Sequence, residues 1–155
     1  MALKSLDQLR SIRSMLLNMR NIWLRRKGVV LGARPSISLS SVFETSPGST
    51  ITIGDDTLVA FKSLITTRAG GGEPRAISIG ARCFVGGGSM IMPGVTIGDE
   101  CIVAAGAVVF QDLPPRSIAA GNPARVLRTG IEVGPYGRLK GADLMSRRTY
   151  DGEDI

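Results

Sequence analysis

Aliphatic residues recur at six-residue steps through most of this chain. The series runs through Leu31 and Ile37, then Ile53, Val59 and Ile65, and then Ile79, Val85, Ile91, Ile97, Val103 and Val109. A six-residue step does not fit the 3.6-residue period of an α-helix, and it exceeds the two-residue period of a simple strand. It fits short strands joined by regular corners, where each corner returns the same position to the interior.

Two other positions of each six-residue unit are restricted in size. The residue after the aliphatic is small in most units (Gly54, Ala60, Gly80, Gly86, Gly98 and Ala104), and the fourth residue after it is mostly small or β-branched (Thr57, Ser63, Cys83, Ser89, Val95, Cys101 and Ala107). A tight corner and a narrow interior would impose such limits. With 5% aromatic residues and 20 glycines, the chain must fill its core with aliphatic side chains between glycine turns, which favours a thin β-rich architecture.

Residues 29–128, and above all "ISIGARCFVGGGSMIMPGVTIGDECIVAAGAVVFQDLPPRSIAAGNPARVLR", resemble the hexapeptide-repeat acyltransferase family. The resemblance implies an all-β fold, a left-handed parallel β-helix of triangular section with three hexapeptides in each coil. It also implies a homotrimer. We expect about five coils over 29–128, a basic helix over 1–28 and a C-terminal tail over 129–155.

The two cysteines, Cys83 and Cys101, are too few for a disulfide scaffold and lack the spacing of a metal site. They lie eighteen residues apart at equivalent offsets in the repeat. If three units make one coil, they stack in neighbouring coils about 4.8 Å apart. We interpret them as reduced residues that fill small inward sites.

The family resemblance implies an acyltransferase that uses acetyl-CoA or another acyl-CoA as its donor, with each active site between two prisms. Similarity to the sugar O-acetyltransferase branch places Gly87 and Ala105 where family backbones meet the pantetheine arm. It places Arg125 and Arg128 near the nucleotide phosphates, a role that suits forked cationic donors. A solvated pair of arginines is the simpler interpretation of these two residues.

One departure from the family pattern falls on the expected cofactor surface. Many members have Thr-Lys after the last pair of valines, whereas this chain has Phe110 and Gln111. The change removes one cation from the expected phosphate surface.

Between Ile65 and Ile79 the repeat is interrupted by about eight extra residues, with a glycine triplet followed by Pro74. Such a segment cannot continue a coil, so we expect a loop at about 66–76 that bulges outward. In the family this region lies beside the active site, and a histidine near its start takes the proton of the acceptor hydroxyl. The matching residue here is Arg68, and the chain contains no histidine.

Arginine cannot act as the base, because its pKa above about 12 keeps it protonated at neutral pH. Arg68 could instead hold an anionic acceptor or stabilise the tetrahedral oxyanion. Glu73 is the nearest carboxylate that could serve as base, and a solvated loop charge is the simpler interpretation of it. A related branch, the tetrahydrodipicolinate succinyltransferases, is thought to use a carboxylate. No metal is expected, because the zinc-dependent branch of the family holds its metal with three histidines.

The first 27 residues carry the whole charge excess of the protein. Seven basic residues and one acidic residue give this segment a net charge of +6, which equals the net charge of the chain. Apolar residues at three- and four-residue steps (Leu9, Ile12, Leu16, Met19 and Trp23) place a stripe along one face of a helix. We expect this stripe to pack on the domain or on a sister subunit, or to contact a membrane surface.

We expect a cytoplasmic protein that, through this helix, contacts the membrane at most peripherally. No apolar tract is long enough to cross a bilayer, and no secretion signal follows the basic start. Nucleic acid is not an expected partner, since the rest of the chain is neutral and has no recognised binding motif.

The last 27 residues have mixed charge and little periodicity, so we expect a tail that wraps the prism or is partly disordered, with Tyr136 and Leu139 able to pin it. Two classes of function remain. The first is an acetyl-CoA-dependent O-acetyltransferase acting on a sugar hydroxyl in surface polysaccharide or glycan synthesis, because a basic leader before "RRKGVVLGARPSI" is typical of that branch. The second is a non-catalytic β-helix scaffold or binding protein that has lost the catalytic histidine.

Overall fold

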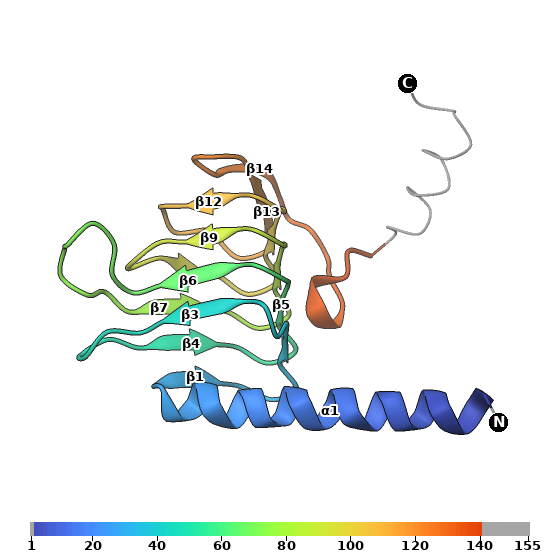
Figure 1. The fold of residues 1–155 in the computed structure, drawn as a ribbon. Coiled ribbons are helices and arrows are strands. Elements are labelled where there is room, and N and C mark those ends of the chain that lie inside the picture. Colours follow the sequence, from blue (N-terminus) through green and yellow to red (C-terminus); the bar gives the residue numbers. More distant parts are fainter. Residues whose placement is uncertain (1, 141–155) are drawn as a thin grey trace.

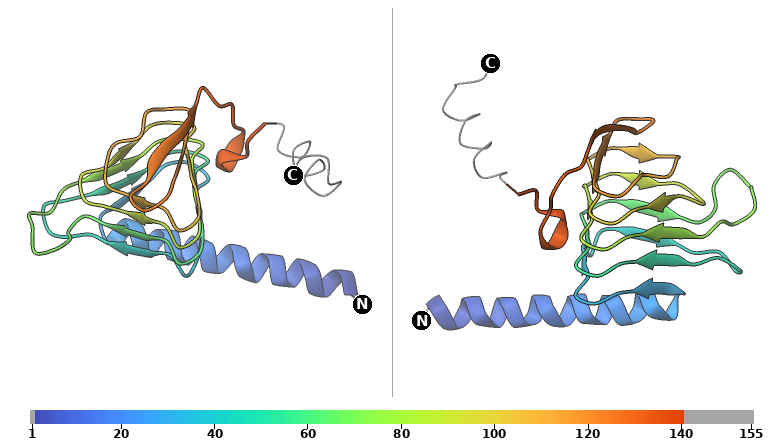
Figure 2. Two further views of the ribbon diagram at one scale, coloured as in Figure 1. Left: turned by 90° about the horizontal axis from the view of Figure 1, so that it is seen from above. Right: turned by 180° about the vertical axis from the view of Figure 1, so that it is seen from behind.

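The computed structural model describes residues 2–140, without the side chains of residues 2–11 and 13. A long helix, α1 (Ala2–Arg26), precedes a stack of short strands, and a short 3-10 helix, η1 (Pro135–Gly137), follows them. The strands form three sheets that make the sides of a triangular prism, with α1 lying across one end (Figures 1 and 2).

Each sheet takes one strand from each of the four complete coils. Sheet A contains β1 (Val29–Leu31), β4 (Ile51–Ile53), β7 (Ile77–Ile79) and β10 (Thr96–Ile97). Sheet B contains β2 (Ser36–Ile37), β5 (Leu58–Val59), β8 (Phe84–Val85), β11 (Ile102–Val103), β13 (Ser117–Ala120) and β14 (Arg125–Thr129). Sheet C contains β3 (Val42–Glu44), β6 (Leu64–Thr66), β9 (Met90–Ile91) and β12 (Val108–Val109). All pairings are parallel except that of β13 with β14. The predicted parallel β-helix is therefore confirmed.

The expectation of about five coils was wrong, since only four are complete. The fifth begins at Leu113, which forms a single parallel bridge with Ile97 in place of a strand. Pro114 and Pro115 follow at once, and proline has no N–H to donate to a ladder. The fifth coil then adds only β13, and the antiparallel strand β14 closes that end of the stack.

The six-residue repeat forms the core. Ile53, Ile79 and Ile97 are in register in sheet A, and each is about 1% exposed. The predicted small positions are buried as well (Thr57, Ser63, Cys83, Ser89, Val95, Cys101 and Ala107). Burial of an aliphatic side chain stabilises the fold by about 1.5–3 kcal/mol. The repeat supplies one such residue on each side of the complete coils, except on sheet C in the first coil, where Phe43 takes the position.

The two cysteines stack as predicted, and both are free and buried. The backbone amide of Cys101 donates to the Sγ of Cys83 at 3.4 Å. The row continues with Thr57 below and Ser117 above, so hydroxyls and thiols follow one corner of the prism. The hydrogen bond with Cys101 and burial together raise the pKa of the Cys83 thiol.

The corner between sheets A and B carries a charge ladder that the sequence analysis did not identify. Arg34, Asp56, Arg82, Glu100 and Arg116 each have positive φ, between 48° and 60°, at equivalent places in successive coils. Their charges alternate in sign along the stack. Arg34 pairs with Asp56 at 2.6 Å, Arg82 pairs with Glu100, and Arg116 lies 3.9 Å from Glu100. The pairs lie at the surface, where solvent and salt screen the charges, so we expect each to contribute little to stability.

Helix α1 turns a different face to the prism from the one predicted. Leu24 is fully buried and Leu17 is half-buried, whereas Leu16, Met19 and Trp23 of the predicted stripe are 43%, 60% and 47% exposed. Packing of the stripe on the domain is therefore wrong. The two leucines are one heptad apart, and two apolar residues are too few to mark a face in the sequence.

The last described segment, residues 131–140, returns along the prism. The amide of Tyr136 donates to the carbonyl of Asp56 at 2.7 Å, and Gly137 lies so close to Phe84 that a Cβ there would come within 2.5 Å of the Cβ of Phe84. Tyr136 and Leu139, which bridges to Val133, both lie in this returning segment. The remainder of the expected tail, 141–155, lies outside the described residues.

Candidate functional site

Two loops leave the prism at the same corner, where sheet C passes into sheet A. The longer one, residues 67–76, is the loop that the sequence predicted. It does not disturb the ladder of sheet C, because Leu64 before the loop pairs with Met90 in the coil that follows it. Met90 in turn pairs with Val108, and the coil between these two residues has no such insertion. The shorter one, residues 45–50, was missed. Its signal was the step from Phe43 to Ile53, which is longer than six and contains Pro47 and Gly48.

The two loops are joined at their bases. The hydroxyl of Ser49 donates to the hydroxyl of Thr67 at 2.8 Å, and the amide of Ser46 donates to the same atom at 3.0 Å. Thr67 is fully buried, whereas residues 68–73 are exposed. The longer loop therefore has a fixed base and a solvent-exposed tip, which projects from the prism in Figure 1.

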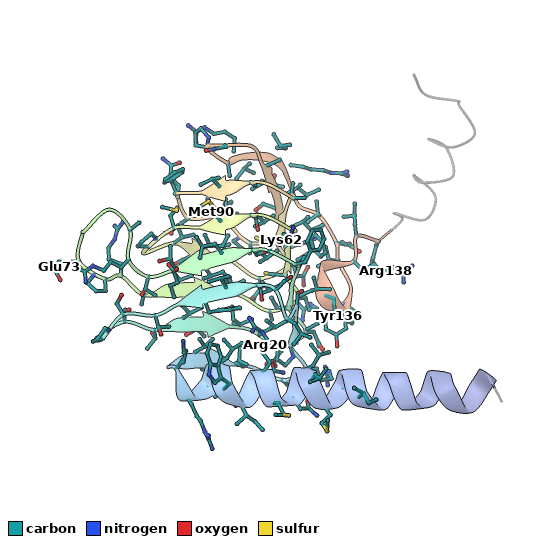
Figure 3. All side chains as sticks on the ribbon, in the orientation of Figure 1. Arg20, Lys62, Glu73, Met90, Tyr136 and Arg138 are labelled. Carbon is teal, nitrogen blue, oxygen red and sulfur yellow. The ribbon has the colours of Figure 1, made fainter. Side chains whose placement is uncertain are left out.

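Glu73 and Phe110, which the sequence analysis placed in different roles, line one open pocket of about 400 Å³. The loop contributes Glu73 and Arg75, and the ends of the strands in the coils above contribute Met92 and Phe110. Figure 3 shows Glu73 at the outer edge of the loop. The pocket thus combines an apolar floor with one carboxylate and one guanidinium, a composition that can hold an uncharged acceptor and move a proton.

Arg75 is a pocket residue that the sequence analysis missed. Its side chain lies against Gly94, where a Cβ would come within 3.1 Å of the guanidinium Nε. Gly94 also has a φ of 83°, in the region that favours glycine. The sequence offered no signal for this packing, because Arg75 has no fixed place in the repeat.

Arg68 shares the loop with Glu73 but does not line the pocket. Its backbone amide donates to the hydroxyl of Thr66 at 3.3 Å, and the same hydroxyl donates to the carbonyl of Arg68 at 2.7 Å. The backbone of Arg68 is therefore held at the end of β6, while its side chain is exposed.

Gly87 and Ala105 lie at the next corner, between sheets B and C, one above the other in successive coils. The amide of Gly106 donates to the carbonyl of Gly87 at 2.9 Å. The ring of Phe61 covers Gly87, since a Cβ there would come within 2.8 Å of the ring. Phe61 occupies the same place one coil below, and the sequence analysis did not consider it.

The remaining cofactor candidates gather at the β14 end of the prism. The amide of Ala124 donates to the carbonyl of Val108 at 2.8 Å, which fixes the turn before β14 against β12. Arg125 begins β14, and Phe110 and Gln111 follow β12 directly. The structure therefore brings these three exposed residues to one end of sheet C, whereas Arg128 lies further along β14, opposite Ile118.

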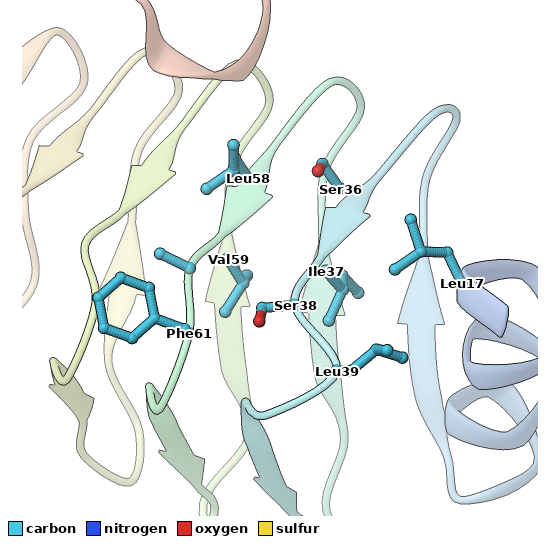
Figure 4. Close-up of a pocket in the computed structure, with 9 residues that line it drawn as sticks. Leu17, Ser36, Ile37, Ser38, Leu39, Leu58, Val59 and Phe61 are labelled. Atoms are coloured by element: carbon cyan, nitrogen blue, oxygen red, sulfur yellow. The ribbon is translucent and has the colours of Figure 1, made fainter. Parts of the chain in front are cut away.

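A second open hollow, of about 360 Å³, lies on the outer face of sheet B between α1 and Phe61 (Figure 4). Leu17, Leu39 and Phe61 are among its lining residues, together with two serine side chains. It contains no titratable group, so it offers no acid or base.

No group of three or more His, Cys, Asp or Glu residues that could hold a metal ion occurs in the described part of the chain. Among residues 2–140, no helix is long and apolar enough to cross a membrane.

The chain is similar to acetyltransferases. Residues 76–111 match the family described as the hexapeptide repeat of succinyl-transferase. The galactoside O-acetyltransferase of Escherichia coli is 38% identical over 89 residues, which cover 51% of this chain and 44% of that protein. In a putative acetyltransferase of Saccharomyces cerevisiae the matched region covers 26% of that protein. The chain therefore spans less than half the length of these curated relatives.

Solved structures give the same result for the fold. A hexapeptide-repeat acetyltransferase from Vibrio cholerae, solved with acetyl-coenzyme A, has a TM-score of 0.61 at 33% identity and covers 66% of this chain and 61% of that one. The polySia-specific acetyltransferase NeuO has a TM-score of 0.67 at 25% identity, covering 82% of this chain and 64% of that one.

Proposed function

Starting from the hexapeptide-repeat β-helix that this chain shares with acetyltransferases, we propose that it is an acyl-CoA-dependent O-acyltransferase with acetyl-CoA as donor. The observation that carries the proposal is the pocket shared by Glu73 and Phe110 at the corner beside sheet C. One of the similar structures contains acetyl-coenzyme A, which supports a CoA thioester as partner.

In the proposed reaction, a hydroxyl of the acceptor attacks the carbonyl carbon of the thioester, and the carbon–sulfur bond breaks. The hydroxyl proton passes to the carboxylate of Glu73 and then to the departing thiolate of CoA, so that free CoA and an ester are released. Glu73 is a suitable base because it lines the pocket and because these 155 residues contain no imidazole.

Two arginines of the same loop would assist this step. Arg75 lines the pocket beside Glu73, so its guanidinium is placed to hold the acceptor. We assign Arg68 the stabilisation of the oxyanion or of an anionic acceptor, for which its exposed side chain must turn toward the thioester.

For the donor, we propose that the pantetheine arm runs past Gly87 and Ala105 and that Arg125 and Arg128 bind the phosphates. The ring of Phe61 on Gly87 would then contact the arm or move away from it. Phe110 and Gln111 would lie between the arm and the pocket, at the end of sheet C that also presents Arg125. The homotrimer of the family would add a second prism to each site.

The proposed acceptor is a sugar hydroxyl of a polysaccharide or glycan. The names of two similar proteins, a galactoside O-acetyltransferase and a polySia-specific acetyltransferase, support this class. A lipid-linked glycan would place the reaction at the cytoplasmic face of a membrane, the peripheral location that the basic N-terminal helix predicts.

The test is direct: incubate the protein with acetyl-CoA and a panel of sugars, and follow the release of free thiol. We expect release that depends on the acceptor. Binding of CoA without thiol release for any sugar would favour the second candidate, a non-catalytic scaffold, which the lack of histidine supports.

A further inference from the structure

The apolar stripe of α1 has no partner in the described structure. Ile12, Leu16, Met19 and Trp23 of the predicted stripe are joined on this face by Met15 and Ile22, and Ile12, Met15 and Ile22 are 51%, 55% and 54% exposed. The opposite face of the helix binds the prism through the buried Leu24 and through Arg20, which donates to the carbonyl of Ser41. Exposed apolar area of this extent marks a surface that another molecule covers.

The shape of the stripe argues against a simple coiled coil. Consecutive members such as Met15 and Leu16, or Ile22 and Trp23, broaden the stripe beyond the two positions per heptad that form a coiled-coil seam. A paired helix also needs acidic residues beside its basic ones, and the segment has one acidic residue against seven basic ones. Two copies of this helix would bring like charges together.

The charge of α1 matches an anionic surface. The side chains of Arg26 and Lys27 are exposed at the end of the helix, and only the backbone carbonyl of Lys27 contacts the prism, where it accepts from the hydroxyl of Thr45 at 2.8 Å. The side chain of Arg25, in contrast, donates to the carbonyl of Leu31 at 3.1 Å. The ammonium of Lys27 lies 4.1 Å from the ring centre of Trp23. A tryptophan beside a lysine at the border of an apolar stripe is typical of a helix that lies in a lipid interface.

The position of α1 allows such a contact without hindrance from the prism. Figures 1 and 3 show the helix running across the end of the coil stack, with side chains on its outer side pointing away from the sheets. A flat surface can therefore meet the full length of the stripe, with β14 at the far end of the molecule.

We propose that the outer face of α1 docks this protein on a membrane surface rich in anionic lipid, with Leu16, Met19 and Trp23 in the interface and with Arg26 and Lys27 on the headgroups. The helix lies parallel to the surface and the coils stack away from it. This assignment is independent of the catalytic roles proposed for the loop at 67–76.

Trp23 provides the test, since it is the single tryptophan of the chain. The full-length protein is mixed with vesicles of phosphatidylglycerol and brominated phosphatidylcholine at low salt. We expect Trp23 emission to shift to shorter wavelength and to be quenched by the bromine, together with co-sedimentation of the protein. Vesicles of phosphatidylcholine alone give neither effect.

Two variants separate the apolar and the ionic contributions. Leu16→Gln with Met19→Gln should lower partitioning by roughly tenfold or more, and Arg26→Gln with Lys27→Gln should lower it by about fivefold per charge at low salt. Leu39→Gln is the matched control, because Leu39 is 51% exposed but belongs to the prism. It should bind vesicles as the wild type does. Circular dichroism checks that each variant is folded.

Two results would overturn the proposal. One is the absence of both the emission shift and co-sedimentation with anionic vesicles at low salt. The other is a Trp23 that is already shielded from a soluble quencher without vesicles, with an assembly that becomes smaller in the Leu16→Gln, Met19→Gln variant. That outcome would assign the stripe to a second copy of the chain.

Discussion

Glu73 and Phe110 line the same pocket, although Glu73 belongs to the loop before β7 and Phe110 follows β12. The β-helix causes this proximity, because its coils stack strand ends from distant parts of the chain along one corner. A carboxylate on a projecting loop thereby lies next to the end of sheet C, where the donor is proposed to bind.

Replacing Glu73 with glutamine should lower the acyl transfer rate by a factor of about 10² to 10⁴, because the change removes the proton acceptor but keeps the shape of the side chain. The dissociation constant for CoA should not change. Steady-state thiol release and calorimetric titration measure the two quantities. Glu44→Gln is the matched control, an exposed carboxylate at the end of β3, and full activity of Glu73→Gln would exclude the carboxylate base.

Arg68→His would place an imidazole with a pKa near neutrality at the position where the family resemblance expects one. If Glu73 is the natural base, this variant should gain little when the wild type is active. Activity in Arg68→His and none in the wild type would instead mark a protein that has lost its catalytic function. The same thiol assay distinguishes the two cases.

Arg125→Gln should weaken CoA binding by roughly tenfold, since a charge-assisted bond to phosphate contributes about 1.5–3 kcal/mol and solvent screens part of it. The turn that carries Arg125 is bonded to β12, so the loss should appear in the affinity for CoA and not in the fold. Arg34→Gln, on the charge ladder at another corner, should bind CoA as the wild type does. Equal affinities for all three proteins would remove Arg125 from the site.

The two thiols should be inert in the native protein and react only after unfolding. Cys83 and Cys101 are fully buried, and the hydrogen bond with Cys101 and burial raise the pKa of Cys83. A thiol reagent should therefore count no cysteine at neutral pH in buffer and 2 per chain in denaturant. Rapid native labelling would contradict the stacked, buried arrangement. Inert protein thiols also keep the background of the thiol-release assay low.

Gly98→Ala should destabilise the prism strongly. A Cβ at this corner would lie 2.6 Å from the backbone nitrogen of Pro115 in the next coil, so the coils would have to separate. We expect a loss of about 1–3 kcal/mol in the free energy of unfolding, as for other overpacked sites. Gly134→Ala is the control, because its nearest contact would be 3.9 Å, and equal denaturation midpoints for both variants would contradict the stacking at this corner.

The sequence was sufficient to predict the repeat core, because Ile53, Ile79 and their equivalents are both periodic and buried. It was not sufficient at Phe43, a core residue that is aromatic where the series is aliphatic. Because Phe43 was not counted in the series, the extra residues of the loop at 45–50 were not recognised. The predicted number of coils was too high, because Pro114 and Pro115 shorten the last coil.

The candidate site was harder to predict, because contacts between coils depend on the lengths of the loops between them. Phe61 lies over Gly87 only because the loop at 67–76 adds its residues without shifting the register of sheet B. Arg75 reaches the pocket by packing on Gly94, a contact between residues that share no repeat position. One alternative for α1, the packing of its apolar stripe on the domain, was wrong, since the prism contacts the face with Leu17 and Leu24 and leaves the stripe exposed.

Acetyltransferase activity is measured most directly as the transfer of labelled acetyl from acetyl-CoA to a sugar hydroxyl by the full chain. Mass spectrometry of the acceptor and thiol release are followed in the same reaction. We expect an acetyl ester on the acceptor in equal amount to the free CoA formed, with both lost in Glu73→Gln. A wild-type protein that binds no acetyl-CoA and acetylates no sugar of the panel would contradict this expectation.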